Sequence, residues 1–161
     1  MPSWEIHNKW AEKLGLPLEY TEKVNEIIDF SREGHDRVIR YPGVLTSQSR
    51  KLWKKYGDDI VKAFILCLQL DVMARHMYRY LILRVYKGQY RNIDADRAVK
   101  WTIEMMPFYM SMGGSYKCHG IEYGKIIAEL NDFIKRNKEE IFSDIKEEIL
   151  RKYNLLHDYQ I

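Results

Sequence analysis

The chain has 161 residues and 46% of them are apolar, which is typical of one domain with a single sizeable core. Charged residues make up 30%, and only 9 glycines and 4 prolines are present, so a disordered or collagen-like chain is excluded. A net charge of +3 does not by itself indicate a nucleic-acid-binding protein. Because no internal repeat and no Pro/Gly/Ser-rich linker interrupts the sequence, we interpret residues 1–161 as a single helical domain.

Two amphipathic helices are predicted in the N-terminal part of the chain. Ser3 is a suitable N-cap for a helix that runs to about Leu14. Apolar side chains recur every four residues along this helix, as they do in a buried stripe. A second helix begins near Thr21 and weakens around Gly34.

A turn and a short helix precede the longest predicted element. Tyr41-Pro42-Gly43 indicates the turn, and an amphipathic pattern predicts a helix over Ser49–Tyr56. Asp58 then caps a helix that continues towards Lys87, with apolar residues spaced three and four apart on a core-facing stripe. About 30 residues at about 1.5 Å each extend about 45 Å, which leaves room for a kink or a break.

The C-terminal half continues the helical pattern. Asp94 caps a helix through about Met106, which ends near Pro107. An irregular segment over residues 110–120 precedes two closing helices, near Ile121–Arg136 and Glu139–Tyr153. No sustained period-two alternation suggests a sheet. We therefore predict an all-α, single-domain bundle of about six to seven helices with one long central helix.

The sequence also predicts where the protein resides. Charged and polar residues interrupt the longest apolar segments, so no membrane span is expected. The N-terminus lacks the basic start, apolar stretch and cleavage site of a signal peptide. We therefore expect a soluble, cytoplasmic protein. The many Lys, Glu, Ile and Tyr residues beside only four Gln resemble the bias of thermophilic proteins.

Histidines and aspartates form the main candidate site. The chain has five histidines, and two of them are followed directly by aspartate, as His35-Asp36 and His157-Asp158. Imidazole and carboxylate are good ligands for divalent transition metals, and carboxylates also suit Mg²⁺ and Mn²⁺. A His from one helix, a His-Asp pair from a second and an Asp from a third could chelate one ion. Such a site can leave positions open for water and a phosphate oxygen.

Three parts of the sequence resemble the signature of the HD-domain phosphohydrolases. These are His7, the pair His35-Asp36 and the segment Asn92–Arg97, in matching order and rough spacing. In that all-helical superfamily an isolated His, a His-Asp pair and a later Asp hold a divalent metal that activates water against a phosphoester. The resemblance implies a Mn, Mg, Ni or Zn ion. It also implies the ligand set His7, His35, Asp36 and Asp94, with Asp96 as the substitute for Asp94.

Structural roles explain several of the same residues. His7 lies beside the apolar stripe of the first helix and fits a helix-surface position, and Asp94 fits an N-cap. His76 follows the core stripe of the long helix, which favours a core histidine. Asp71, about 140° around that helix from His76, could reach a partner from another helix.

Basic residues and tyrosines are concentrated in two stretches of the chain. From Ser31 to Gly57 there are seven basic and two acidic residues, and from Arg75 to Arg91 there are five basic and no acidic ones. Arg and Lys neutralise phosphates, and aromatic rings stack on unpaired bases. A solvated helix face is the structural alternative. The candidate phosphate-binding residues are Arg37, Arg40, Arg75 and Arg79.

Two functions from different classes follow. The first is a metal-dependent phosphohydrolase of HD type that acts on a nucleotide or nucleic-acid phosphoester, with no catalytic side chain assigned beyond the ligands. The alternative is a non-catalytic helical module that binds nucleic acid or protein through the basic Arg/Tyr surface. Aromatic residues on more than one face of the long helix leave a homo-oligomer open. The phosphate-binding loop, dinucleotide-binding and zinc-finger patterns are absent, which argues against those functions.

Overall fold

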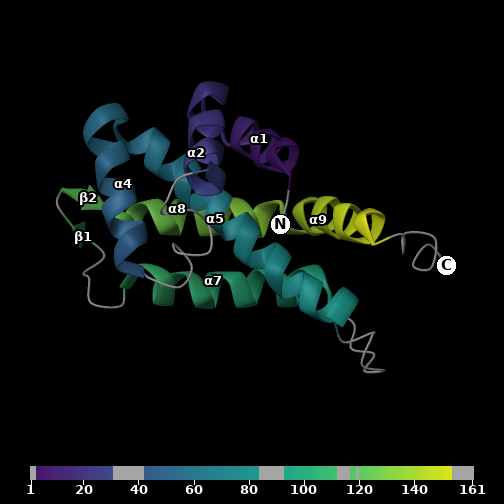
Figure 1. Cartoon of the computed structure of the whole chain (residues 1–161). Helices are drawn as coiled ribbons and strands as arrows, with labels where there is room; N and C mark the ends of the chain where they lie inside the picture. Colours follow the sequence, from purple (N-terminus) through teal and green to yellow (C-terminus); the bar gives the residue numbers. More distant parts are fainter. Residues whose placement is uncertain (1–2, 31–41, 84–92, 112–116, 119, 154–161) are drawn as a thin grey trace.

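A computed structural model describes residues 3–30, 42–83, 93–111, 117–118 and 120–153. Apart from two very short strands, the regular structure in these residues is helical, so the predicted all-α fold is confirmed (Figure 1). Helices α1 and α2 lie at the top of Figure 1 and α7 at the bottom, while α5 crosses between them.

The first two helices follow the sequence prediction closely. Helix α1 spans Trp4–Lys13, and Ser3 is its N-cap because the Ser3 hydroxyl accepts a hydrogen bond from the backbone N–H of Ile6 at 3.4 Å. The backbone N–H of Ser3 donates to Glu148 at 2.7 Å, which joins the start of α1 to the C-terminal helix. Helix α2 spans Leu18–Phe30, three residues earlier at its start than the pattern predicts.

The next helices differ from the prediction at their ends. Helix α4 spans Pro42–Tyr56, so the expected turn at residues 41–43 is instead the start of a helix. Proline suits this position because the first backbone N–H groups of a helix have no partner within it.

Gly57, at φ +87°, separates α4 from α5, which spans Asp58–Tyr78. Gly57 is the N-cap of α5, so the prediction that Asp58 caps it is wrong; the Asp58 carboxylate accepts from Trp53 Nε1 at 2.7 Å instead. A π-helical turn, η1, continues the helix over Arg79–Leu83, so the described part of the long helix contains no break. The predicted end near Lys87 lies outside the described residues.

The C-terminal half contains the only strands that the described residues form. Helix α7 spans Ala95–Ser111 and continues past Pro107, where the prediction ended it. Strands β1 (Lys117–Cys118) and β2 (Ile121–Glu122) pair antiparallel and are too short to produce a visible alternation. Helices α8 (Tyr123–Arg136) and α9 (Lys138–Lys152) match the two predicted closing helices.

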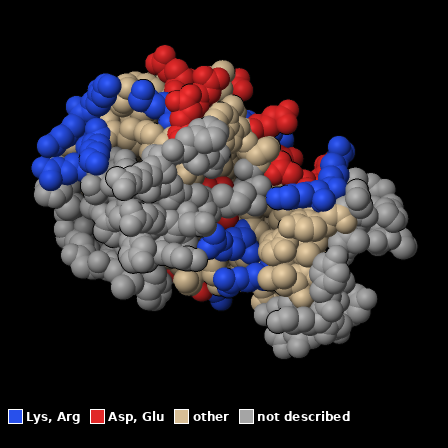
Figure 2. Space-filling view, in the orientation of Figure 1, with Lys and Arg blue, Asp and Glu red and all other residues tan. Residues whose placement is uncertain are grey.

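The core surrounds α5, the long central helix. Helix α5 is buried along most of its length and packs against α1, α2, α4, α7, α8 and α9. No helix of the described segments combines the length and the apolar character needed to cross a bilayer. Charged side chains are unevenly spread over the face in Figure 2, where acidic groups gather along the top and basic groups over α4 at the upper left.

Candidate functional site

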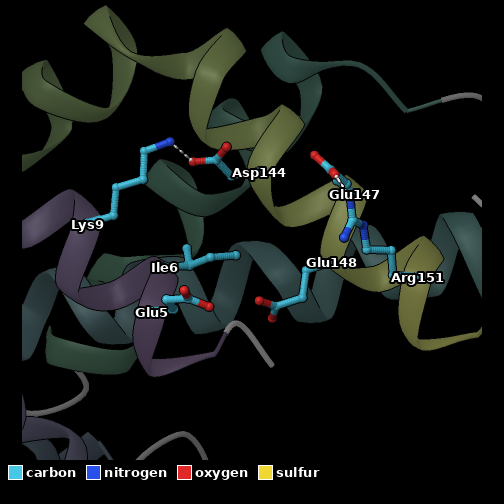
Figure 3. A pocket seen from close by; sticks show the side chains of 7 residues that line it. All are labelled: Glu5, Ile6, Lys9, Asp144, Glu147, Glu148 and Arg151. Carbon is cyan, nitrogen blue, oxygen red and sulfur yellow. Dashed lines mark hydrogen bonds and ion pairs between the residues drawn. The ribbon is translucent and has the colours of Figure 1, made fainter.

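A groove between α1 and α9 is one hollow in the described surface (Figure 3). It has a volume of about 500 Å³. Lys9 bonds Asp144 across it at 2.7 Å, and Arg151 pairs with Glu147. Glu5 and Glu148 add two more carboxylates to its lining, so acidic side chains outnumber basic ones. This balance repels a phosphoester, and the groove is not the site that the sequence predicts.

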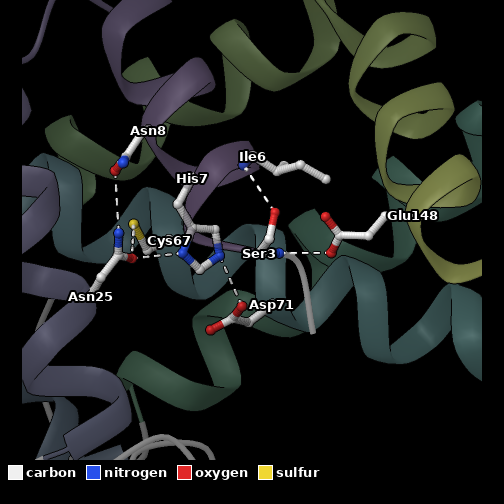
Figure 4. A network of polar contacts seen from close by, with 8 residues as sticks. All are labelled: Ser3, Ile6, His7, Asn8, Asn25, Cys67, Asp71 and Glu148. Atoms are coloured by element: carbon white, nitrogen blue, oxygen red, sulfur yellow. Dashed lines mark hydrogen bonds and ion pairs between the residues drawn. The ribbon is translucent and has the colours of Figure 1, made fainter. Parts of the chain in front are cut away.

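A buried polar network joins α1, α2 and α5 around His7 (Figure 4). The His7 side chain approaches Asn25 of α2 with Nδ1, 2.8 Å from Oδ1. It approaches Asp71 of α5 with Nε2, 3.0 Å from Oδ1. His7 is 4% exposed and Asp71 is fully buried, so the helix-surface interpretation of His7 is wrong. The side chain faces the bundle interior because α2 and α5 both pack against this face of α1.

The orientation of the Asn25 amide sets the protonation of His7. Asn25 Nδ2 donates to Asn8 Oδ1 at 3.2 Å, and Asn25 Oδ1 accepts from the buried Cys67 thiol at 3.9 Å. The oxygen of this amide therefore faces His7, and Nδ1 of His7 carries the proton that it donates. The second ring nitrogen, Nε2, faces the Asp71 carboxylate.

A proton or a metal ion must lie between His7 Nε2 and Asp71. When Nδ1 is protonated, the neutral imidazole presents a lone pair at Nε2, and a carboxylate oxygen also presents only lone pairs. Burial lowers the pKa of His7, but electrostatic interaction with Cys67 and the hydrogen bond to Asp71 raise it by more, so it lies well above its ordinary value. A proton on Nε2 supplies the charge in the metal-free protein.

A divalent ion could supply the same charge. When two ligand atoms each lie about 2.1 Å from an ion and the angle between their bonds at the ion is a right angle, the two atoms are about 3.0 Å apart. Nε2 of His7 and Oδ1 of Asp71 are 3.0 Å apart. A ligating histidine also commonly donates its other N–H to a neighbouring oxygen, as His7 does to Asn25. The donor set therefore fits two neighbouring ligands of one metal ion.

The structure describes only part of the remaining predicted ligand set. His35 and Asp36 lie outside the described residues, as do Arg37 and Arg40. Asp94 is exposed and accepts a hydrogen bond from the backbone N–H of Arg97 at 2.8 Å, which is the N-cap role that the sequence offers as the alternative.

Asp96, the substitute for Asp94, is engaged in an ion pair. Asp96 pairs with Lys138 of α9 at 2.5 Å. Within the described segments, no three His, Cys, Asp or Glu side chains gather as a metal site would need. The structure thus brings together His7 and Asp71, a residue that the sequence assigns only to an unknown partner. Its position within the apolar run of α5 is the signal that could have identified it.

Two of the four predicted phosphate-binding arginines are described, one near the end of α5 and one in η1. Arg75 is half-buried and Arg79 is exposed. His76 is buried and stacks on Trp101 with ring centroids 4.1 Å apart, so the core-histidine interpretation is confirmed. Arg97 lies over the ring of Tyr80, 5.6 Å from its centroid.

Comparison of the chain with protein-family models, curated proteins and solved structures finds no match. A functional interpretation therefore depends on the residues and the geometry of the chain itself.

Proposed function

We propose that this protein is a metal-dependent phosphohydrolase of the HD type that acts on a phosphoester of a nucleotide or nucleic acid. The observation that supports it is the buried contact between His7 Nε2 and Asp71 Oδ1, two groups that a proton joins in the metal-free protein and that a divalent ion could join in its place. In this proposal Asp71 replaces Asp94 as the ligand from a later helix. The pair His35-Asp36 supplies the remaining ligands.

The position of the His-Asp pair in the chain agrees with this ligand set. Helix α2 contributes Asn25 to the His7 network, and His35 follows the last residue of α2, Phe30, by five positions. The pair is therefore tethered to an element of the same site. A fully buried carboxylate such as that of Asp71 is also costly unless a positive charge compensates it.

The chain's own residues have distinct roles in this proposal. Asn25 holds the Nδ1 proton of His7 and leaves Nε2 for the ion, and Asp71 contributes an anionic oxygen. A bound ion would lower the pKa of its water so that hydroxide is available near neutral pH. Arg75 follows Asp71 by one helical turn on α5, a position suited to binding the substrate phosphate and stabilising its developing charge.

Metal binding to specific variants tests the ligand set. Protein stripped with chelator is titrated with Mn²⁺, Ni²⁺ and Zn²⁺ by calorimetry, and its folding is checked by circular dichroism. We expect Asp71→Asn to weaken binding at least tenfold and Asn25→Ala to weaken it about 10–100-fold. Asp94→Asn is the matched control, since it changes the same group at an exposed N-cap, and it is expected to bind as the wild type does.

An activity assay accompanies the titration. The metal-loaded protein is expected to hydrolyse bis(p-nitrophenyl) phosphate, and Asp71→Asn is expected to abolish this. The proposal is wrong if the stripped wild type binds none of the three ions, or if Asp71→Asn binds them unchanged. A non-catalytic binding function through Arg75 and Arg79 is then the interpretation that remains from the sequence.

A further inference from the structure

A basic and aromatic surface lies where the end of α4 meets α2. We call it the α4 surface, and its residues are Tyr20, Lys23, Lys51, Lys54, Lys55 and Tyr56. The three lysines on α4 are exposed, and the basic side chains gathered over α4 are visible at the upper left of Figure 2.

Two ammonium groups of this surface converge on one tyrosine. The Nζ atoms of Lys23 and Lys55 lie 5.2 Å and 5.4 Å from the ring centroid of Tyr56. A hydrogen bond from Lys23, followed by one from Lys55, lowers the pKa of the Tyr56 hydroxyl. The ring of Tyr20 lies beside that of Tyr56, with centroids 5.9 Å apart. Cations and two aromatic rings therefore share one small area.

Carboxylates neutralise the α4 surface only in part: the hydrogen bond to Tyr56 and, to a lesser degree, the charge of Glu26 raise the pKa of Lys23. Among the described residues, Lys23, Lys51, Lys54 and Lys55 form no ion pair with an acidic side chain. Several other lysines differ, since those on α1, at position 62 and at the start of α9 each pair with Asp or Glu at 3.4 Å or less. Lys23 and Lys55 hydrogen-bond to Tyr56 but are not ion-paired with a carboxylate, so all four ammonium groups can still bind an external anion.

We propose that the α4 surface binds single-stranded nucleic acid, with the lysines on backbone phosphates and Tyr20 stacked on a base. Ammonium groups beside accessible aromatic rings are the combination by which proteins hold unpaired strands without sequence preference, and the half-buried rings of Tyr20 and Tyr56 leave part of their surface accessible. An acidic peptide would use the lysines but would gain little from the paired tyrosine rings.

This surface shares α2 with the His7 network but lies on another face of that helix, because Lys23 precedes Asn25 by two residues, about 200° around the helix. Tyr56 lies two residues before α5 begins, whereas Asp71 lies 13 residues into it, about 20 Å further along the helix axis. Binding at the α4 surface therefore does not depend on a metal ion at His7, and loss of one function leaves the other measurable.

Fluorescence anisotropy with a labelled 15-nucleotide oligo(dT) tests this proposal in the full chain. We expect the double variant Lys23→Ala/Lys55→Ala to bind at least tenfold more weakly at 100 mM NaCl. The slope of log Kd against the logarithm of the salt concentration should also be smaller by about 1.4 for this variant. Two phosphate contacts are lost, and each contributes about 0.7 to the slope. Tyr20→Leu should weaken binding while Tyr20→Phe retains it, since stacking needs the ring and not the hydroxyl.

A charge-matched variant distinguishes this surface from general attraction. Lys100→Ala/Lys125→Ala removes the same charge from exposed positions on α7 and α8 and should leave the oligonucleotide affinity within twofold. An equal loss in this control would overturn the proposal, as would binding that ignores ionic strength. Tighter binding to poly-glutamate, or to vesicles of phosphatidylcholine with phosphatidylserine, would also overturn it in favour of an acidic protein or a membrane.

Discussion

Replacing Asp71 by Asn is predicted to destabilise the metal-free protein in a pH-dependent way. The substitution keeps the size of the side chain but removes the negative charge that faces His7 Nε2 at 3.0 Å. His7 is 4% exposed and Asp71 is fully buried, so solvent screens this pair little. Removing one partner of a buried ion pair costs about 3–5 kcal/mol, a large share of the 5–15 kcal/mol typical of a domain.

The sign of the pH dependence follows from the raised pKa of His7. Burial lowers that pKa, but Cys67 and Asp71 raise it by more, so the folded state binds the proton more tightly than the unfolded chain does. The stabilisation is therefore fully present below the pKa of the unfolded histidine, about 6.5. It is lost as the pH rises through the higher pKa of the folded state. The cost of Asp71→Asn should be greatest near pH 6 and should shrink as the pH rises.

Urea unfolding in the presence of EDTA measures this difference. Wild type, Asp71→Asn and Asp94→Asn are compared at intervals from about pH 6 to pH 9, with the free energy of unfolding taken from linear extrapolation. Asp94→Asn should change stability little at any pH, because Asn is as good an N-cap as Asp. A cost below about 1 kcal/mol for Asp71→Asn, or a cost that does not vary with pH, would refute an ionic His7–Asp71 pair.

Four other substitutions test the packing that positions these helices. Gly120→Ala should lower the melting temperature, because Gly120 has φ +90° and a Cβ there would lie 2.9 Å from the Trp53 ring. The backbone strain alone costs about 1–2 kcal/mol, and Gly15→Ala, with a similar φ but open space, should cost less. Ser3→Ala should cost about 1 kcal/mol through loss of the N-cap of α1, measured by urea unfolding. Trp10→Ala should cost about 3–5 kcal/mol in the same assay, because its side chain is fully buried; a loss under about 1 kcal/mol would contradict that packing.

The sequence by itself was sufficient to predict most of the helices. Apolar spacing is a local property, and it predicted α1, α8 and α9 with ends close to those observed, as well as the start of α5. Local capping chemistry likewise predicted Ser3 as the start of α1 and offered the N-cap role that Asp94 has at α7. The buried position of His76 followed from the same spacing along α5.

Other local features gave too weak a pattern for correct assignment. The turn signal at Pro42 coincides with the first residue of α4, because proline suits both a turn and the first helical position. Pro107 does not end α7. The strands β1 and β2 have two residues each, too few for an alternation to be recognised.

Only the tertiary structure decided which groups meet at His7. Asp71 lies 64 positions from His7 in the chain, and Asn25 lies 18 positions away. Sequence reasoning identified His7 and noted that Asp71 could reach another helix, but it did not join the two. The contact arises where α1, α2 and α5 cross, and a crossing depends on how whole helix faces pack together. Periodicity reports which face of a helix is buried, whereas the partner across that face is determined by the packing of the complete bundle.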